Sequence, residues 1–137
     1  MQNKELNVLD IPKWGRYLRG KWIESFAANL TIEERKEIYM DQFLWHLCSY
    51  EKVECLEKEE AISAFEKKNK KQCTIFYQFS DDAYLVQHAK NLSVQDLPRD
   101  EWNMDYQDLY VMDQDHQWTF IITHENDWLG PYFIEMG

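Results

Sequence analysis

Apolar residues return every four positions near the start of the chain. This stripe predicts an amphipathic helix with one strongly aromatic face, and its members are Trp14, Leu18, Trp22, Phe26 and Leu30. Asp10 stands where it can cap the helix, and Pro12 fits the first turn, where a missing N–H costs little. Residues 1–9 are mostly polar, and we expect them to be frayed.

Further helices are predicted by their start and stop signals. Thr31 is followed three residues later by Glu34, a capping-box pattern that predicts a helix ending near Met40. Residues 54–68 have acids in the first turns, an apolar stripe and lysines at the end, which is typical of a helix. A single helical turn is expected over residues 93–97, where Pro98 ends it.

Strand-like runs occur in the middle and at the end of the chain. Residues 73–79 alternate in the manner of a strand, and residues 84–89 predict another short one. Residues 43–50 are apolar and aromatic but too few for periodicity to separate helix from strand; we interpret them as a strand. Residues 109–125 contain two strand-like runs around a polar turn, which predicts a closing hairpin.

These elements predict an α+β fold. We expect one domain over residues 1–137, with a largely antiparallel sheet of about 4–5 strands packed against 2–3 helices. A chain of 137 residues is long enough to bury a core without staples, and no repeat or linker divides it.

The charge of the chain is concentrated in its last part. Residues 1–99 hold 16 acids against 15 Lys and Arg, whereas residues 100–137 hold nine acids and no Lys or Arg. An acidic surface repels phosphate backbones and anionic lipid, so direct nucleic-acid or membrane binding is not expected. A basic protein is the complementary partner.

The N-terminal sequence lacks the pattern of a signal peptide, and no window approaches 18 uninterrupted apolar residues. The three cysteines have no Cys-x-x-Cys spacing, which agrees with free thiols in a reducing compartment. We therefore expect a cytoplasmic protein.

His124 and Glu125 are the first candidates for chemistry. They are adjacent on a predicted strand, so they point to opposite faces and form no dyad unless a bulge intervenes. The pair does not form a zinc-protease motif, because Trp128 stands where the second His is needed. Asp113 begins a run that resembles a calcium loop, but Trp118 occupies the required Gly position. No metal site is predicted.

His46 and Cys48 are two residues apart on the interpreted strand. They could form a nucleophile pair or two metal ligands; alternatively they are a hydrogen-bonded core histidine and a small hydrophobe. With His124, they are the catalytic candidates. Only four glycines occur in the chain and no phosphate-binding loop is present, so no cofactor is predicted.

A concave patch is possible if the histidine-bearing strands share one sheet. His46, His124, Tyr50 and Tyr77 would then meet, although His124 could equally fix the turn at Gly130 and Pro131. The binding candidates are Tyr50, Tyr77, Trp118, His124, Glu125 and Tyr132.

Several short motifs resemble a family of short proteins, classed as a domain of unknown function, from bacilli and related bacteria. They are Leu44-Trp45-His46 with Ser49-Tyr50, Ile75-Phe76-Tyr77-Gln78, Trp118-Thr119, Thr123-His124-Glu125 and Gly130-Pro131-Tyr132-Phe133. This resemblance covers most of the chain and implies no activity. The Trp…Thr-His-Glu hairpin is also similar to those of small bacterial immunity-type proteins.

Two functional hypotheses follow from these observations. In the first, an immunity- or antitoxin-like interaction protein presents its acidic C-terminal sheet to a basic partner such as a toxin nuclease. In the second, a small hydrolase or a metal- or ligand-binding protein uses His46, Cys48 and His124 in a cleft. The distance between the two imidazoles separates these hypotheses.

Overall fold

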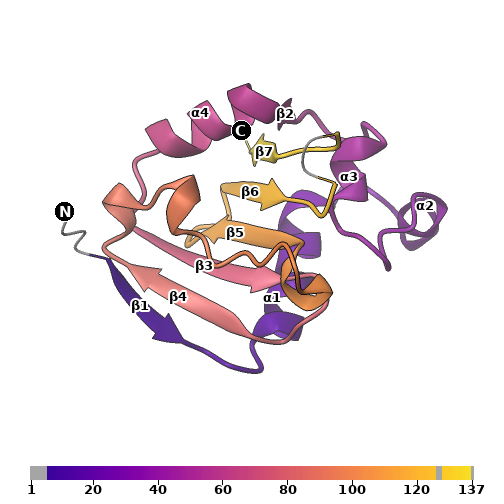
Figure 1. The fold of residues 1–137 in the computed structure, drawn as a ribbon. Helices are drawn as coiled ribbons and strands as arrows, with labels where there is room; N and C mark the ends of the chain where they lie inside the picture. Colours follow the sequence, from indigo (N-terminus) through magenta and orange to yellow (C-terminus); the bar gives the residue numbers. More distant parts are fainter. Residues whose placement is uncertain (1–5, 126–127, 137) are drawn as a thin grey trace.

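The computed structural model describes residues 6–125 and 128–136. They form one antiparallel sheet with the strand order β1-β4-β3-β5-β6-β7-β2 (Figure 1). The strands are β1 (Asn7–Asp10), β2 (Leu56–Glu57), β3 (Gln72–Tyr77), β4 (Ala83–Gln87), β5 (Leu109–Asp113), β6 (Trp118–Ile122) and β7 (Tyr132–Glu135). The helices are α1 (Gly15–Phe26), α2 (Ile32–Glu37), α3 (His46–Ser49) and α4 (Lys58–Lys67), and the 3-10 turns are η1 (Ala89–Asn91), η2 (Val94–Asp96) and η3 (Met104–Tyr106).

The sheet separates two apolar layers. Alternation along β3 and β5 sends Phe76 and Tyr110 to one face and Ile75 and Val111 to the other. The first face is covered by α1 and by residues 38–48, and the second by α4 and by residues 89–106. Figure 1 shows α1 behind the sheet and the segment with the 3-10 turns in front of it. The central strands are therefore buried on both faces.

The α+β class is confirmed, although the predicted 4–5 strands and 2–3 helices were too few. The described residues contain seven strands and four α-helices. Two of the additional strands are short edges: β1 pairs with β4, and β2 has two residues and pairs with β7. Both lack the alternating apolar pattern that identifies a half-buried strand, because all their residues are exposed.

The N-terminal expectations were wrong in two respects. Residues 7–9 are not frayed but form part of β1, while residues 1–5 lie outside the described residues. Asp10 ends that strand and does not cap α1, whose N-cap is Trp14. A positive φ of 74° at Lys13 turns the chain between the two elements. Gly15 is needed at the start of α1, because a Cβ there would lie 2.7 Å from the Cα of Asp81.

Residues 43–50 are not a strand. Hydrogen bonds from Ser49 N to Trp45 O (3.2 Å) and from Tyr50 N to His46 O (2.9 Å) close the single turn α3. The buried residues of this segment are Leu44, Trp45, Leu47 and Cys48, which is the spacing of one helix face. The Thr31 capping box and the closing hairpin are confirmed. The helix predicted over residues 54–68 begins only at Lys58, because residues 56–57 form β2, and the strand predicted over residues 84–89 is Ala83–Gln87.

Candidate functional site

Several loops meet at one end of the sheet. Neighbouring antiparallel strands run in opposite directions, so the end of β3, the start of β5, the end of β6 and the start of β7 share this end. The connector before β5 is tied to the loop after β6 by Arg99, whose guanidinium donates to the carbonyl oxygens of Gln107 and Thr123 at 2.9 and 3.1 Å. α3 completes the end through aromatic contacts.

Asp108 holds three of these segments together. Its carboxylate is 1% exposed. Oδ1 accepts from Trp45 Nε1 and from the backbone amide of His124, each at 2.9 Å. The same carboxylate lies 3.1 and 3.2 Å from His124 Nδ1. A buried carboxylate with this many donors is a satisfied polar centre that fixes α3 and the loop after β6 relative to β5.

The Asp108 carboxylate fixes the orientation of the His124 imidazole. An ionised carboxylate only accepts, so Nδ1 carries the proton and Nε2 points away from Asp108. The side chain of His124 is 31% exposed, and its ring packs 5.1 Å from Phe43 and 5.7 Å from Trp45 between centroids. His124 lies beyond the last residue of β6, so the face expected from strand alternation does not apply to it.

His46 lies in the same aromatic cluster. Its Nδ1 donates to the carbonyl oxygen of Ile38 at 2.6 Å, and its ring contacts Phe43, Trp45 and Tyr50 at 5.3, 4.8 and 5.2 Å. The two histidines thus contact the same pair of rings, and no hydrogen bond joins them within the described residues. His46 and Tyr50 were predicted to share one face of a strand. They meet instead because His46 begins the helical turn α3 and Tyr50, four residues later, is its C-cap.

The predicted binding residues do not form one patch. Tyr77 and Trp118 lie in the core on the opposite face of the sheet, and the Tyr77 hydroxyl donates to the carbonyl oxygen of Pro98. Burial raises the pKa of Tyr77 well above its ordinary value. Tyr132 is also buried, and desolvation raises its pKa to about 12. Tyr50 and Glu125 are exposed.

Among the described residues, His124 is hydrogen-bonded to Asp108 and not to the turn at Gly130 and Pro131, which was the alternative role considered for it. Thr123 holds this turn instead, through a hydrogen bond from its hydroxyl to the carbonyl oxygen of Leu129. The same hydroxyl accepts from the amide of Glu125 at 3.1 Å.

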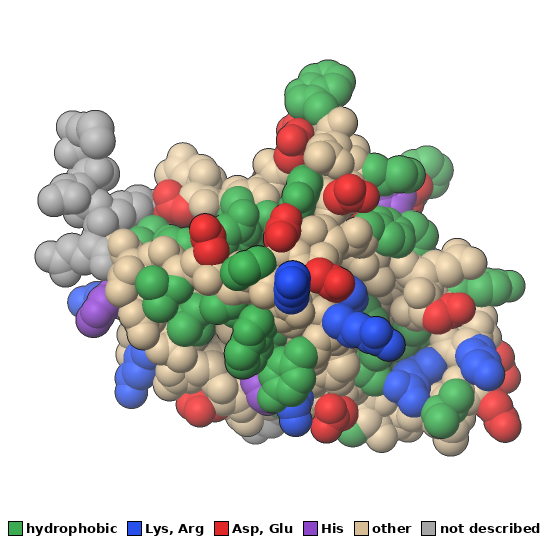
Figure 2. All heavy atoms as spheres, turned by 90° about the horizontal axis from the view of Figure 1, so that it is seen from below, with side chains coloured by type: hydrophobic (Ala, Val, Ile, Leu, Met, Phe, Trp, Pro, Cys, Tyr) green, Lys and Arg blue, Asp and Glu red, His purple; other side chains and the backbone are tan. Residues whose placement is uncertain are grey.

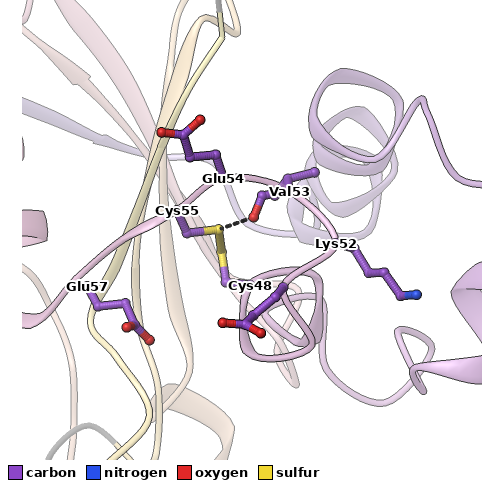
Figure 3. Close-up of a pocket in the computed structure, with 7 residues that line it drawn as sticks. Cys48, Lys52, Val53, Glu54, Cys55 and Glu57 are labelled. Atoms are coloured by element: carbon purple, nitrogen blue, oxygen red, sulfur yellow. Dashed lines mark hydrogen bonds between the residues drawn. A yellow bond between two sulfur atoms is a disulfide. The ribbon is translucent and has the colours of Figure 1, made fainter.

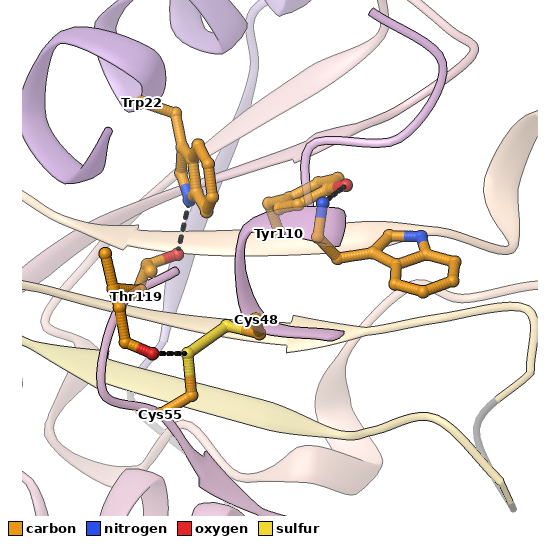
Figure 4. The surroundings of a disulfide bond; sticks show 7 residues. Trp22, Cys48, Cys55, Tyr110 and Thr119 are labelled. Atoms are coloured by element: carbon orange, nitrogen blue, oxygen red, sulfur yellow. Dashed lines mark hydrogen bonds between the residues drawn. A yellow bond between two sulfur atoms is a disulfide. The ribbon is translucent and has the colours of Figure 1, made fainter. Parts of the chain in front are cut away.

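Cys48 is joined to Cys55 by a disulfide (Figure 4). The prediction of free thiols was therefore wrong for these two residues, and the Cys48 thiol is not a nucleophile in this state. Their spacing gave no signal, because the pair is brought together by the turn of α3 and the approach to β2. Cys73 is free and buried, and burial raises the pKa of its thiol to about 12.

Hydrophobic side chains are exposed on the described parts of the loops around this end. Trp102, Met104 and Trp128 are 93%, 70% and 79% exposed. The connector that carries Trp102 is held by hydrogen bonds from the Trp102 amide to Asp100 Oδ1 (2.9 Å) and from Tyr106 to Asp82 (2.7 Å). No signal in the sequence indicates a role for Trp102 or Asp108, because isolated residues in an acidic loop form no motif.

The described acids of the C-terminal region lie in loops and at strand ends. The burial of β5 and β6 leaves no acidic sheet face. Asp100, Glu101 and Asp105 are exposed on the connector beside Trp102. Figure 2 shows acidic side chains set among hydrophobic ones in the upper part of that view, with the basic side chains mostly below them.

No group of three or more His, Cys, Asp and Glu side chains within the described residues could hold a metal ion. In the same part of the chain, no helix has both the length and the apolar character needed to cross a bilayer.

Comparison with known proteins gives a family and no function. A family model described as a domain of unknown function (DUF4275) matches residues 1–133. No curated protein matches the chain. No solved structure matches it either.

Proposed function

The chain belongs to this domain-of-unknown-function family, and we propose that it is an interaction protein that binds a basic protein partner. The proposed contact is the docking surface, defined as Trp102, Met104 and Trp128 with the neighbouring acids Asp100, Glu101, Asp105 and Glu125. An immunity- or antitoxin-like role, in which the partner is a basic toxin, is one such function.

The observation that carries the proposal is the exposure of the large apolar side chains Trp102, Met104 and Trp128. Trp102 is 93% exposed although its own amide is hydrogen-bonded to Asp100. Trp and Met are enriched in the buried centres of protein interfaces, and truncated Trp residues often cost about 2 kcal/mol or more of binding energy. A partner that covers these side chains would remove their apolar surface from water.

The charge around these side chains favours a basic partner. Residues 100–137 contain no Lys or Arg, but cations from outside this stretch reach the surface. Arg99 lies 3.9 Å from Glu101 and donates to two backbone carbonyls, and Lys58 Nζ donates to the carbonyl oxygen of Trp128 at 3.0 Å. A mainly acidic rim accelerates association with a positively charged partner and disfavours a negatively charged one. This effect weakens as salt screens the exposed carboxylates.

The hydrogen bonds of Asp108 and Arg99 hold the segments beside the docking surface in place before a partner binds. Asp108 ties α3, β5 and the loop after β6 together, and Arg99 ties the connector to that loop. Loops fixed before binding lose less conformational entropy when a partner arrives.

A peptide array tests the proposal. The array holds peptides of constant length and aromatic content with graded net charge, probed with the wild-type protein and a Trp102→Ala, Trp128→Ala double variant. We expect binding to rise with positive charge and to be lost in the double variant. Trp14→Ala is the matched control, because Trp14 is about half exposed at the N-cap of α1 and belongs to neither of the loops that carry Trp102 and Trp128. Binding that ignores peptide charge, or that the control alone abolishes, would refute the proposal.

One observation favours a second function, acid–base catalysis by His124. Its Nδ1 is held by a buried carboxylate while Nε2 points away from it, which is the orientation of a general base. The assay is hydrolysis of p-nitrophenyl esters by the wild type and by His124→Gln. Loss of activity in the variant, with its fold intact, would support this function. Equal rates would reject it.

A further inference from the structure

We propose that the Cys48–Cys55 disulfide is a thiol–disulfide exchange site that reacts with small neutral or cationic thiols through an acidic hollow. The proposal stands apart from the docking surface, because its test follows sulfur chemistry and needs no protein partner.

The two cysteines differ in their access to solvent. Cys48 lies within α3, is 4% exposed and belongs to the apolar core on the α1 face of the sheet. Cys55 precedes β2, and it is only partly buried against that core. Figure 4 shows the bond between them near Trp22, Thr119 and Tyr110 of this core. A thiolate arriving from solvent therefore reaches the sulfur of Cys55 first.

A hollow of about 440 Å³ opens beside the bond (Figure 3). Both cysteines line it, together with Glu51, Lys52, Val53, Glu54 and Glu57. The volume lies within the range of small-molecule sites. Access of the attacking thiol is a main determinant of the exchange rate, so an open space beside the more exposed sulfur is the feature that exchange requires.

The charges of the hollow select among thiols. Three glutamates and one lysine line it, which gives a formal charge of −2. A thiolate with additional negative charge is repelled on approach, and one that carries an ammonium group is not. The preferred reactants are therefore small thiols that are neutral or cationic apart from the sulfur.

The reaction balances with two equivalents of thiol as the reductant. The first thiolate attacks Cys55 Sγ, the Cys48–Cys55 bond breaks, and Cys48 leaves as a thiolate that takes a proton from solvent. A second thiolate then attacks the outer sulfur of the mixed disulfide and releases Cys55, which is also protonated. Two electrons pass from the two thiolates to the protein, two protons come from solvent, and the reagent becomes its own disulfide.

Cys73 does not compete in this exchange. It is fully buried in the core of the opposite sheet face, where desolvation raises the pKa of its thiol to about 12. It is thus neither a ready nucleophile nor a neighbour of the pair. Exchange is confined to Cys48 and Cys55, and opening the bond releases the short loop between α3 and β2.

The test compares cysteamine, 2-mercaptoethanol and 2-mercaptoethanesulfonate, whose thiolates are increasingly negative. Each reacts with the folded protein at equal thiolate concentration, and its rate is divided by its rate with a small reference disulfide. Acid-quenched samples are analysed by mass spectrometry. We expect the normalised rate to fall about two- to fivefold per added negative charge and the mixed disulfide to form on Cys55.

Variants identify the hollow as the route. A Glu54→Gln, Glu57→Gln double variant should reduce the differences among the normalised exchange rates of the three thiols. High salt should reduce these differences as well. Glu33→Gln on α2, outside the lining of the hollow, should leave these differences unchanged. The proposal is overturned if only the unfolded chain reacts, if the three normalised rates are equal, or if the reagent is attached to Cys48.

Discussion

Asp108 gives a sharp test of how the loops beneath the docking surface are held. The Asp108→Ala substitution removes the acceptor of the Trp45 indole, the His124 amide and His124 Nδ1. The imidazole is 31% exposed and can turn to water, but Trp45 is 2% exposed and its N–H has no other partner within the described residues. An unsatisfied buried donor costs about 1–3 kcal/mol. The substitution leaves two donors without their acceptor, the Trp45 indole N–H and the His124 amide. It also removes the cost of keeping a carboxylate away from water. The balance predicts a loss of about 2–4 kcal/mol in unfolding free energy.

Asp108→Asn is the matched comparison. Both 2.9 Å hydrogen bonds end on Oδ1, so an asparagine oxygen in that position retains them. Its NH₂ group then replaces Oδ2, which lies 3.2 Å from His124 Nδ1. Oδ1 also lies 3.1 Å from Nδ1, so the asparagine oxygen still accepts the Nδ1 proton while the NH₂ group opposes it. We expect a loss of only about 1 kcal/mol, with the His124 tautomer unchanged.

Urea unfolding followed by circular dichroism measures the two losses, with the m-values compared to confirm that the unfolding transition is unchanged in kind. Long-range ¹⁵N–¹H correlation spectra report the His124 tautomer. Equal losses in the two variants would refute the assigned hydrogen bonds. So would a wild-type His124 that carries its proton on Nε2 alone.

Four further predictions concern stability. Gly15→Ala should cost about 1–3 kcal/mol by overpacking, since its Cβ would meet the Asp81 backbone at 2.7 Å. Gly20→Ala should stabilise by about 0.5–1 kcal/mol in the same urea assay, because a Cβ there meets nothing within 4 Å inside α1; a loss at Gly20 would contradict the packing of this helix. Replacing Cys48 and Cys55 by Ser should lower the unfolding free energy by about 2–3 kcal/mol, because the unfolded chain without the disulfide has more conformational entropy. An unchanged unfolding free energy would contradict a disulfide that persists in the folded protein. The Cys73 thiol has its pKa raised by burial from 9.0 to about 12, so the unfolded chain loses this proton first and stability should fall as pH rises from about 9 toward 12. Cys73→Ala should flatten that fall in thermal unfolding at a series of pH values, and an unchanged slope would contradict this assignment.

The fold was predictable where a pattern repeats. The apolar stripe on α1 and the alternation in β3, β5 and β6 gave the right elements, because each pattern repeats over several residues. The Thr31 capping box gave the start of α2, because both of its hydrogen bonds are local in sequence. The edge strands β1 and β2 were missed because they are held by backbone pairing with β4 and β7, and all their side chains are exposed. Their sequences carry no burial signal for that reason.

The candidate site was predictable only in part. His46, Tyr50 and His124 were selected from the sequence, and they do lie around one aromatic cluster with Phe43 and Trp45. Tyr77 was misplaced because the expected face depended on a strand over residues 43–50, and that segment is helical. Asp108 was missed because the role of a carboxylate depends on which donors the tertiary fold brings to it. The Cys48–Cys55 bond depends on tertiary proximity in the same way.

The most direct test of the docking surface is calorimetric titration of the tightest basic peptide from the array. It compares the wild type, the Trp102→Ala, Trp128→Ala double variant and Trp14→Ala at low and high salt. The account predicts that the double variant binds at least about tenfold more weakly, that Trp14→Ala binds normally, and that high salt weakens wild-type binding. Undiminished binding by the double variant would contradict it, as would tighter binding of a charge-reversed, acidic peptide.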